Sequence, residues 1–283
     1  MTFRSKLSST YVIARRQLRT KKQASQNRRT VYKGTQPNYI FFQKELKQLL
    51  GCNDDWLVET AAEYRSCAPA WKHLSGLRSS SKKTDGYAKS LDVAEGFAVW
   101  ALVKHTRPRV IVELGVQYGV SSRLWKEALK AYVPNHELVL CDLEDKRRFI
   151  GDDECTFLQA DARQVLPKLF ASGEVGILHN DAHPYDLIHW SVTEAIRHNV
   201  PVLTFHDVGR GPRTSFKISS SQLSQEEKLA NTEYSAQYGH WERHVIAEIF
   251  DERILSEDTI ITNSHRIQIF DSLFGFGVVL NNE

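Results

Sequence analysis

The chain has 283 residues, of which 41% are hydrophobic and 25% charged, as in an ordinary globular protein rather than a disordered one. No run of 18 apolar residues occurs, which excludes a predicted transmembrane helix. The length accommodates one large α/β core with small additions. The four cysteines (Cys52, Cys67, Cys141 and Cys155) show no metal-ligand spacing, so we expect a reduced, cytoplasmic protein.

The charge of the chain is distributed unevenly. Residues 1–44 hold eleven Lys or Arg and no acid, so the remaining 26 basic and 34 acidic residues carry a net charge of −8, although the whole chain is at +3. Residues 1–35 are predicted to be a basic tail: a disordered segment, a nucleic-acid arm, a helix in contact with a membrane surface, or an organellar transit peptide. The acidic remainder argues against nucleic acid as the main substrate.

Helical patterns dominate the segment that follows the tail. We expect helices over residues 39–50 and 54–73, which with a linker form a helical cap over residues 36–91. Residues 75–83 are rich in Ser and Lys, as in a hinge or lid. A further helix is predicted over residues 93–106.

From residue 110 onward, short apolar runs alternate with helical segments, the pattern of a parallel sheet covered on both faces. We therefore predict a Rossmann-like, doubly wound, mostly parallel seven-stranded sheet in a domain over residues 92–283, with an insert at residues 209–239. Arg210, Arg213 and Lys217 in the insert either contact an anionic or sugar-like substrate or are solvated. The first expected strand begins at residue 110, and the other six span residues 138–142, 155–161, 175–181, 200–207, 258–262 and 274–280. The expected helices span residues 121–132, 163–171, 185–199 and 240–252.

The first of these strands ends in a glycine turn that opens a helix. Glu113, Gly115, Gly119 and Ser121 form the pattern Glu-Leu-Gly-x-x-x-Gly-x-Ser. A buried strand that turns through glycines into a helix brings backbone N–H groups close to a ligand. Gln117 stands where a dinucleotide-binding motif requires its second glycine. The alternative is an ordinary strand–turn–helix with two turn glycines.

Acidic residues stand at the ends of five predicted strands. In parallel sheets, ligands bind beyond the carboxyl ends of the strands, so these side chains are predicted to converge on one site. They are Glu113, Asp142, Asp161, Asp181 and Asp207.

The glycine turn resembles the first cofactor motif of class I S-adenosylmethionine-dependent methyltransferases, particularly the catechol O-methyltransferase-like group. The patterns Asp181-Ala-His183 and His206-Asp207 resemble those of macrocin O-methyltransferase-like and cephalosporin hydroxylase-like sequences. The resemblance covers roughly residues 92–280, and it implies an antiparallel hairpin at the end of the sheet.

The resemblance implies a binding site for S-adenosylmethionine. Glu113 and Ser121 would hold the methionine part, and Gly115 and Gly119 would let the backbone approach, because a Cβ there would collide with the cofactor. Asp142 would accept both ribose hydroxyls.

Two further acids are candidates for the same site. Glu144 is the alternative to Asp142 for the ribose. Asp161 would face the adenine, or else cap the helix that follows it.

The resemblance also implies a divalent cation, Mg²⁺ or Mn²⁺, bound by Asp181, His206 and Asp207. An imidazole ligand would favour Mn²⁺, Fe²⁺ or Zn²⁺ over Mg²⁺, unless His206 lies behind the ligands. His183 is the candidate general base, with Asp181 as the other catalytic residue. The alternative is that the acids bind cofactor or substrate without a metal.

The sequence therefore predicts an enzyme that transfers a methyl group from S-adenosylmethionine to a hydroxyl of a small-molecule or glycan acceptor, with or without a metal ion. A hydroxylase-like enzyme and a non-catalytic binding protein on the same fold remain alternatives. The oligomeric state is not predicted.

Overall fold

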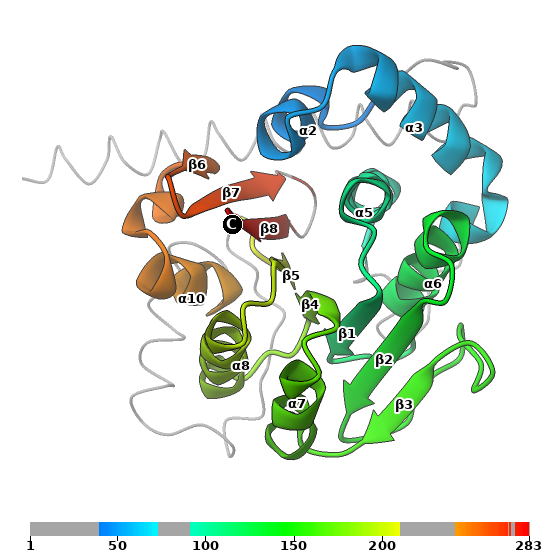
Figure 1. Cartoon of the computed structure of the whole chain (residues 1–283), viewed down its shortest axis with the longest axis vertical. Helices are drawn as coiled ribbons and strands as arrows, with labels where there is room; N and C mark the ends of the chain where they lie inside the picture. Colours follow the sequence, from blue (N-terminus) through cyan, green and yellow to red (C-terminus); the bar gives the residue numbers. More distant parts are fainter. Residues whose placement is uncertain (1–39, 73–90, 210–240, 271, 273–274, 283) are drawn as a thin grey trace, which may run out of the picture.

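The computed structural model describes residues 40–72, 91–209, 241–270, 272 and 275–282 (Figure 1). The predicted tail, the linker at 75–83 and nearly all of the insert at 209–239 lie outside the described residues.

The described strands form one sheet of eight. Its strands are β1 (Val110–Leu114), β2 (Glu137–Asp142), β3 (Thr156–Gln159), β4 (Val175–Asn180), β5 (Val202–His206), β6 (Thr259–Ile261), β7 (His265–Phe270) and β8 (Phe276–Asn281). They lie in the order β3-β2-β1-β4-β5-β8-β7-β6. The five strands from β3 to β5 pair in parallel, and the last three pair antiparallel. The predicted doubly wound, mostly parallel sheet is confirmed.

The predicted number of seven strands is wrong, because β7 was missed. Its sequence places polar Gln268 inside an apolar run, which obscured the strand. Gln268 is nonetheless buried, because Thr259 donates to its Oε1 at 2.8 Å and its own amide donates to the carbonyl of Asp258 at 3.1 Å. Satisfied in this way, a polar side chain can occupy the core.

Helices cover both faces of the sheet (Figure 1). The described helices of eight or more residues are α2 (Gln43–Leu50), α3 (Asp54–Ser66), α5 (Val93–Thr106), α6 (Val120–Tyr132), α7 (Ala162–Ala171), α8 (Tyr185–Arg197) and α10 (Trp241–Ile249). One core joins α2, α3, α5 and α6 to the sheet, and the other joins α7, α8 and α10 to the opposite face. Successive side chains of β1 point to opposite faces of the sheet, so Ile111 packs in the first core and Val112 in the second.

The predicted helix over residues 93–106 agrees with α5 at both ends. Asp92 starts it with a capping box, accepting from the backbone N–H groups of Ala94 and Glu95 while Glu95 accepts from the N–H of Asp92. The helix predicted over residues 54–73 is interrupted, since α3 ends at Ser66 and a second helical segment follows Cys67 over residues 68–72.

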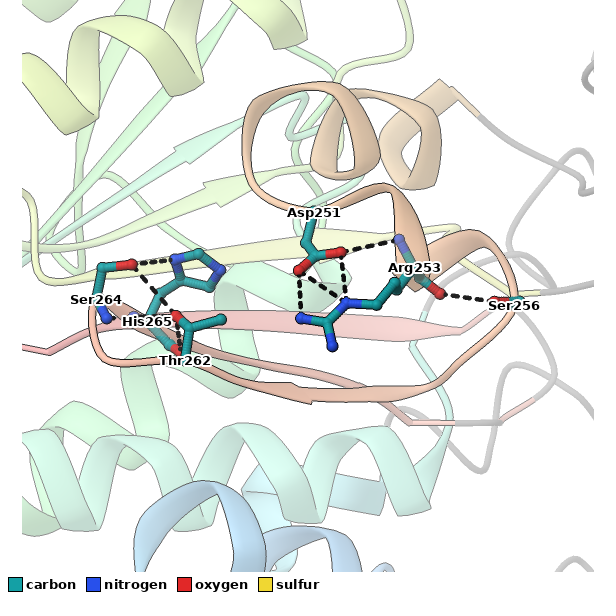
Figure 2. Close-up of polar contacts among 6 residues, drawn as sticks. All are labelled: Asp251, Arg253, Ser256, Thr262, Ser264 and His265. Carbon is teal, nitrogen blue, oxygen red and sulfur yellow. Dashed lines mark hydrogen bonds and ion pairs between the residues drawn. The ribbon is translucent and has the colours of Figure 1, made fainter.

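Contacts between residues close in sequence stabilise the two segments that flank β6 (Figure 2). Asp251 accepts from the backbone N–H of Arg253 at 2.9 Å and also pairs with its guanidinium, which caps the 3-10 helix η2 (Glu252–Leu255). In the turn from β6 to β7, the N–H of His265 donates to Thr262 Oγ1 at 3.0 Å. None of the described helices is long and apolar enough to span a membrane.

A buried arginine joins α10 to the end of β5. The Arg243 side chain is fully buried, and Nε donates to the carbonyl of Ile254 at 2.7 Å. Its terminal nitrogens donate to the carbonyls of Val208 at 3.3 Å and Glu257 at 2.8 Å, and to the Asp258 carboxylate at 2.9 Å. Arg243 therefore fixes α10 beside the strand end that carries Asp207.

Candidate active site

A cavity of about 490 Å³ opens at the carboxyl ends of the parallel strands. This volume lies in the range of small-molecule sites. Of the ten residues predicted for the site, all but Glu113 and Gly119 line the cavity: Gly115, Ser121, Asp142, Asp161, Asp181, His183, His206 and Asp207. Whether they bind a ligand there stays a prediction.

Both glycines of the turn between β1 and α6 have positive φ angles, and protein atoms lie close to each of them. Gly115 has a φ of 81°, and a Cβ there would lie 2.5 Å from the backbone oxygen of Asp181. At Gly119, with a φ of 77°, a Cβ would lie 2.9 Å from Ile150 Cγ2. A side chain at either position would therefore collide with the protein itself, and Gly115 also lines the cavity. Gly115 therefore lets the β1 turn pack against the chain leaving β4.

Gly115→Ala is expected to destabilise the protein more than Gly173→Ala. Both glycines have positive φ, but a Cβ on Gly173 would meet nothing within 4 Å. The conformational cost of about 1–2 kcal/mol is common to both variants, and the collision with Asp181 adds about 1–3 kcal/mol to Gly115→Ala alone. Chemical denaturation of the two variants measures the difference. Equal losses of stability would show that the backbone at Gly115 and Asp181 can move apart to accommodate the methyl group without loss of unfolding free energy.

Asp142 ends β2 and organises the glycine turn. Its Oδ2 accepts from the backbone N–H groups of Val116 at 2.8 Å and Gln117 at 3.0 Å. The carboxylate thus joins the turn to the cavity wall and still presents lone pairs to a ligand. The alternative, Glu144, does not line the cavity, and its side chain is 65% exposed and paired with Lys146.

Glu113 is buried beneath the cavity rather than in its wall. Ser121, which lines the cavity, donates its hydroxyl proton to Glu113 Oε1. Among the described residues, the other carboxylate oxygen has no hydrogen-bond partner. Burial raises the pKa of Glu113 to about 8, because the charged form loses its hydration. A buried acid with an unsatisfied oxygen suits a site that receives a cationic group, such as the ammonium of a methionine moiety.

Asp161 caps the helix that follows it, which is the second of the two roles predicted for this residue. It accepts from the N–H of Arg163 at 2.9 Å and starts α7. It also lines the cavity, so capping and contact with a ligand are compatible.

Asp181, His206 and Asp207 meet where β4 and β5 end. His206 Nδ1 lies 3.0 Å from Asp181 Oδ1 and 3.9 Å from Asp207 Oδ1. Burial alone would lower the pKa of His206, but the two aspartates raise it to about 10. Asp207 has a φ of 61°, in the left-handed region that Asp tolerates better than most residues. A strained backbone of this kind often accompanies a functional site.

His183 lies on the same side of the cavity and contacts a residue that the sequence did not indicate. Its Nδ1 is 3.4 Å from Oε1 of Glu242, a side chain of α10 that is 1% exposed. Burial opposes the charged imidazole, but Glu242 and the neighbouring aspartates raise its pKa to about 9. Burial raises the pKa of Glu242 itself. The sequence pattern of α10 gave no signal for Glu242, because a helical glutamate is usually exposed.

One potential ligand atom each from Asp181, His183 and Asp207 lies within 4.8 Å of the others. This set has His183 in the place predicted for His206, although His206 Nδ1 also lies within 3.9 Å of both aspartates. Two carboxylates and an imidazole fit a divalent cation of the first transition row.

No protein-family model and no curated protein matches the chain. Among solved structures, it is similar to the S-adenosylhomocysteine-bound methyltransferase PaMTH1 of Podospora anserina, with 14% identity over 82% of this chain and 97% of that one (TM-score 0.49). It is also similar to the O-methyltransferase TomG of Streptomyces achromogenes, bound to S-adenosylmethionine, with 16% identity over 84% and 94% of the two chains (TM-score 0.44). A putative O-methyltransferase of Klebsiella pneumoniae shares 14% identity over 85% and 96% (TM-score 0.42).

The strand order and connections of the chain itself define its fold as the Rossmann-like fold expected of a class I methyltransferase. The function proposed below depends on the chain's own residues.

Proposed function

We propose that the protein is an S-adenosylmethionine-dependent O-methyltransferase acting on a hydroxyl of a small-molecule or sugar-containing acceptor. The observation that carries the proposal is that one cavity gathers Asp142 and the glycine turn on one side and the Asp181–Asp207 group on the other. The first side suits a nucleoside with a charged methionine tail, and the second suits a hydroxyl that must become a nucleophile.

The cofactor side would be held by residues of β1, β2 and their loops. Asp142 would accept from the ribose hydroxyls, and Glu113 would act through Ser121 on the methionine ammonium. Both assignments fit the residues present, because Asp142 lines the cavity and Glu113 has an unsatisfied, buried oxygen.

The acceptor side would be held by the ends of β4 and β5. In the transfer, the acceptor oxygen would form a bond to the methyl carbon while the carbon–sulfur bond breaks and its electron pair stays on sulfur, and the hydroxyl proton would pass to water. A divalent cation bound there would lower the pKa of the acceptor hydroxyl. Asp181 and Asp207 would fix the acceptor oxygen in line with the methyl group, and such positioning supplies much of the acceleration in bimolecular transfers.

Calorimetric titration with S-adenosylhomocysteine tests the proposal. The wild-type protein is expected to bind, and Asp142→Ala is expected to weaken binding by about 1.5–3 kcal/mol through loss of charged hydrogen bonds. Asp142→Asn keeps an acceptor for the turn N–H groups, so it separates loss of charge from loss of loop order. Absence of binding in the wild-type protein would contradict the proposed function.

A further inference from the structure

The three converging side chains have two buried groups behind them. Glu242 contacts His183 from α10, and His206 contacts Asp181 from β5. Each backing side chain is almost completely buried, at 1% exposure for Glu242 and 2% for His206. The arrangement therefore has an inner set of three side chains and an outer pair that orients two of them.

Glu242 is placed as carboxylates are placed behind metal-binding histidines. Its Oε1 lies 3.4 Å from His183 Nδ1, and within the part of the chain that the structure describes its Oε2 has no hydrogen-bond partner. A carboxylate on one ring nitrogen fixes the tautomer and the orientation of the imidazole, and it leaves the other nitrogen to bind the ion. A buried carboxylate oxygen without a partner is costly unless the site gains positive charge.

His206 occupies a different position from His183. Its Nδ1 approaches Asp181 at 3.0 Å, so this nitrogen is directed at a carboxylate of the inner set. A histidine in contact with a ligating aspartate orients that aspartate, as hydrogen-bonded partners of ligating carboxylates do.

We propose that His183, held in place by Glu242, is the third protein ligand of a divalent cation bound by Asp181 and Asp207, and that His206 is a positioning residue for Asp181. This assignment rests on the proposed function in one respect, the placement of the ion beside the acceptor hydroxyl. A set of one imidazole and two carboxylates favours Mn²⁺ over Mg²⁺, which prefers oxygen ligands alone. His183 is then a ligand and not the general base expected from the sequence.

Binding of Mn²⁺ to the full-length protein tests the assignment without any turnover. Electron spin echo modulation of bound Mn²⁺ is expected to show coupling to an imidazole ¹⁴N in the wild-type protein. His183→Ala should abolish this coupling, whereas His206→Asn should retain it. His136→Ala, a histidine that does not line the cavity, is the matched control and should leave the spectrum unchanged.

The role of Glu242 has a separate readout. Glu242→Gln is expected to weaken Mn²⁺ binding about 10- to 100-fold, measured from the signal of free Mn²⁺, because the amide orients the imidazole less strongly. Glu248→Gln, an exposed glutamate of the same helix that contacts Tyr185 and His244, should change the affinity by less than about twofold.

Three results would overturn the proposal: no Mn²⁺ binding by the wild-type protein, no nitrogen coupling in its spectrum, or coupling that survives His183→Ala and disappears in His206→Asn. Titration of the same samples with S-adenosylhomocysteine keeps this outcome apart from the proposed function. Cofactor binding without Mn²⁺ binding would refute the metal site alone, and Mn²⁺ binding without cofactor binding would refute the methyltransferase alone.

Discussion

Asp207→Ala is expected to lower methyl transfer about a thousandfold or more, equivalent to about 4 kcal/mol, while cofactor binding persists. Asp207 belongs to the converging set at the acceptor side, whereas Asp142 and the glycine turn lie on other strands. Removing its carboxylate takes away one of two negative charges that would hold a cation beside the acceptor. Formation of S-adenosylhomocysteine in the presence of phenol and sugar acceptors measures the rate, and calorimetry measures the binding.

Asp207→Asn is the companion variant for this experiment. Asparagine adopts the left-handed backbone found at Asp207 and keeps one neutral oxygen, so its activity should fall between those of wild type and Asp207→Ala. Chelator should abolish wild-type activity, and Mn²⁺ should restore it. Full activity of Asp207→Ala in the presence of chelator would show that transfer needs neither this carboxylate nor a metal.

Arg243→Met should have the largest effect on folding of any variant considered, about 3–5 kcal/mol of unfolding free energy. Methionine fills much of the same volume but donates no hydrogen bond. The carbonyls of Ile254 and Val208 and the Asp258 carboxylate would lose their partner inside or beside the core. Each unsatisfied buried acceptor is destabilising in its own right. The midpoint of urea denaturation measures the loss.

Arg253→Met is the matched control for that measurement. The Arg253 guanidinium is 55% exposed and pairs with the Asp251 carboxylate (Figure 2). Among the described residues, it donates to no buried carbonyl. In the variant, water can form the hydrogen bonds that Arg253 gives to Asp251, so the denaturation midpoint should stay nearly unchanged. A similar loss of stability in both arginine variants would mean that the contacts of Arg243 in α10 contribute no more than a surface ion pair.

The parallel half of the fold follows from local patterns in the sequence. Continuous β-branched runs such as that of β1 are buried on both faces, and acids or glycines mark the strand ends. Because parallel strands end at the same edge, listing those ends also locates the site. For that reason the sequence predicts that Asp142, Asp181 and Asp207 share one site, and all three line the cavity.

Features that depend on contacts distant in sequence were not predictable in this way. The strand β7 contains Gln268, whose burial depends on partners in the neighbouring strand. Glu242 contacts His183 across 59 positions, and nothing in its helix distinguishes it from an exposed glutamate. The close contact at Gly115 also depends on a residue distant in sequence, because a side chain there would meet the backbone of Asp181, which follows β4.

The packing of Gly115 against Asp181 has a consequence for anyone who wishes to alter the acceptor range of this protein. Mutant libraries that vary residue 115 would mostly sample destabilised chains, because any side chain there would collide with the backbone of Asp181 and Ala182. Leu187 in α8 also lines the cavity, lies outside the loops after β1 and β2, and does not belong to the carboxylate–histidine set. Variation at this position would reshape the acceptor side of the cavity and leave the contact between Gly115 and Asp181 intact.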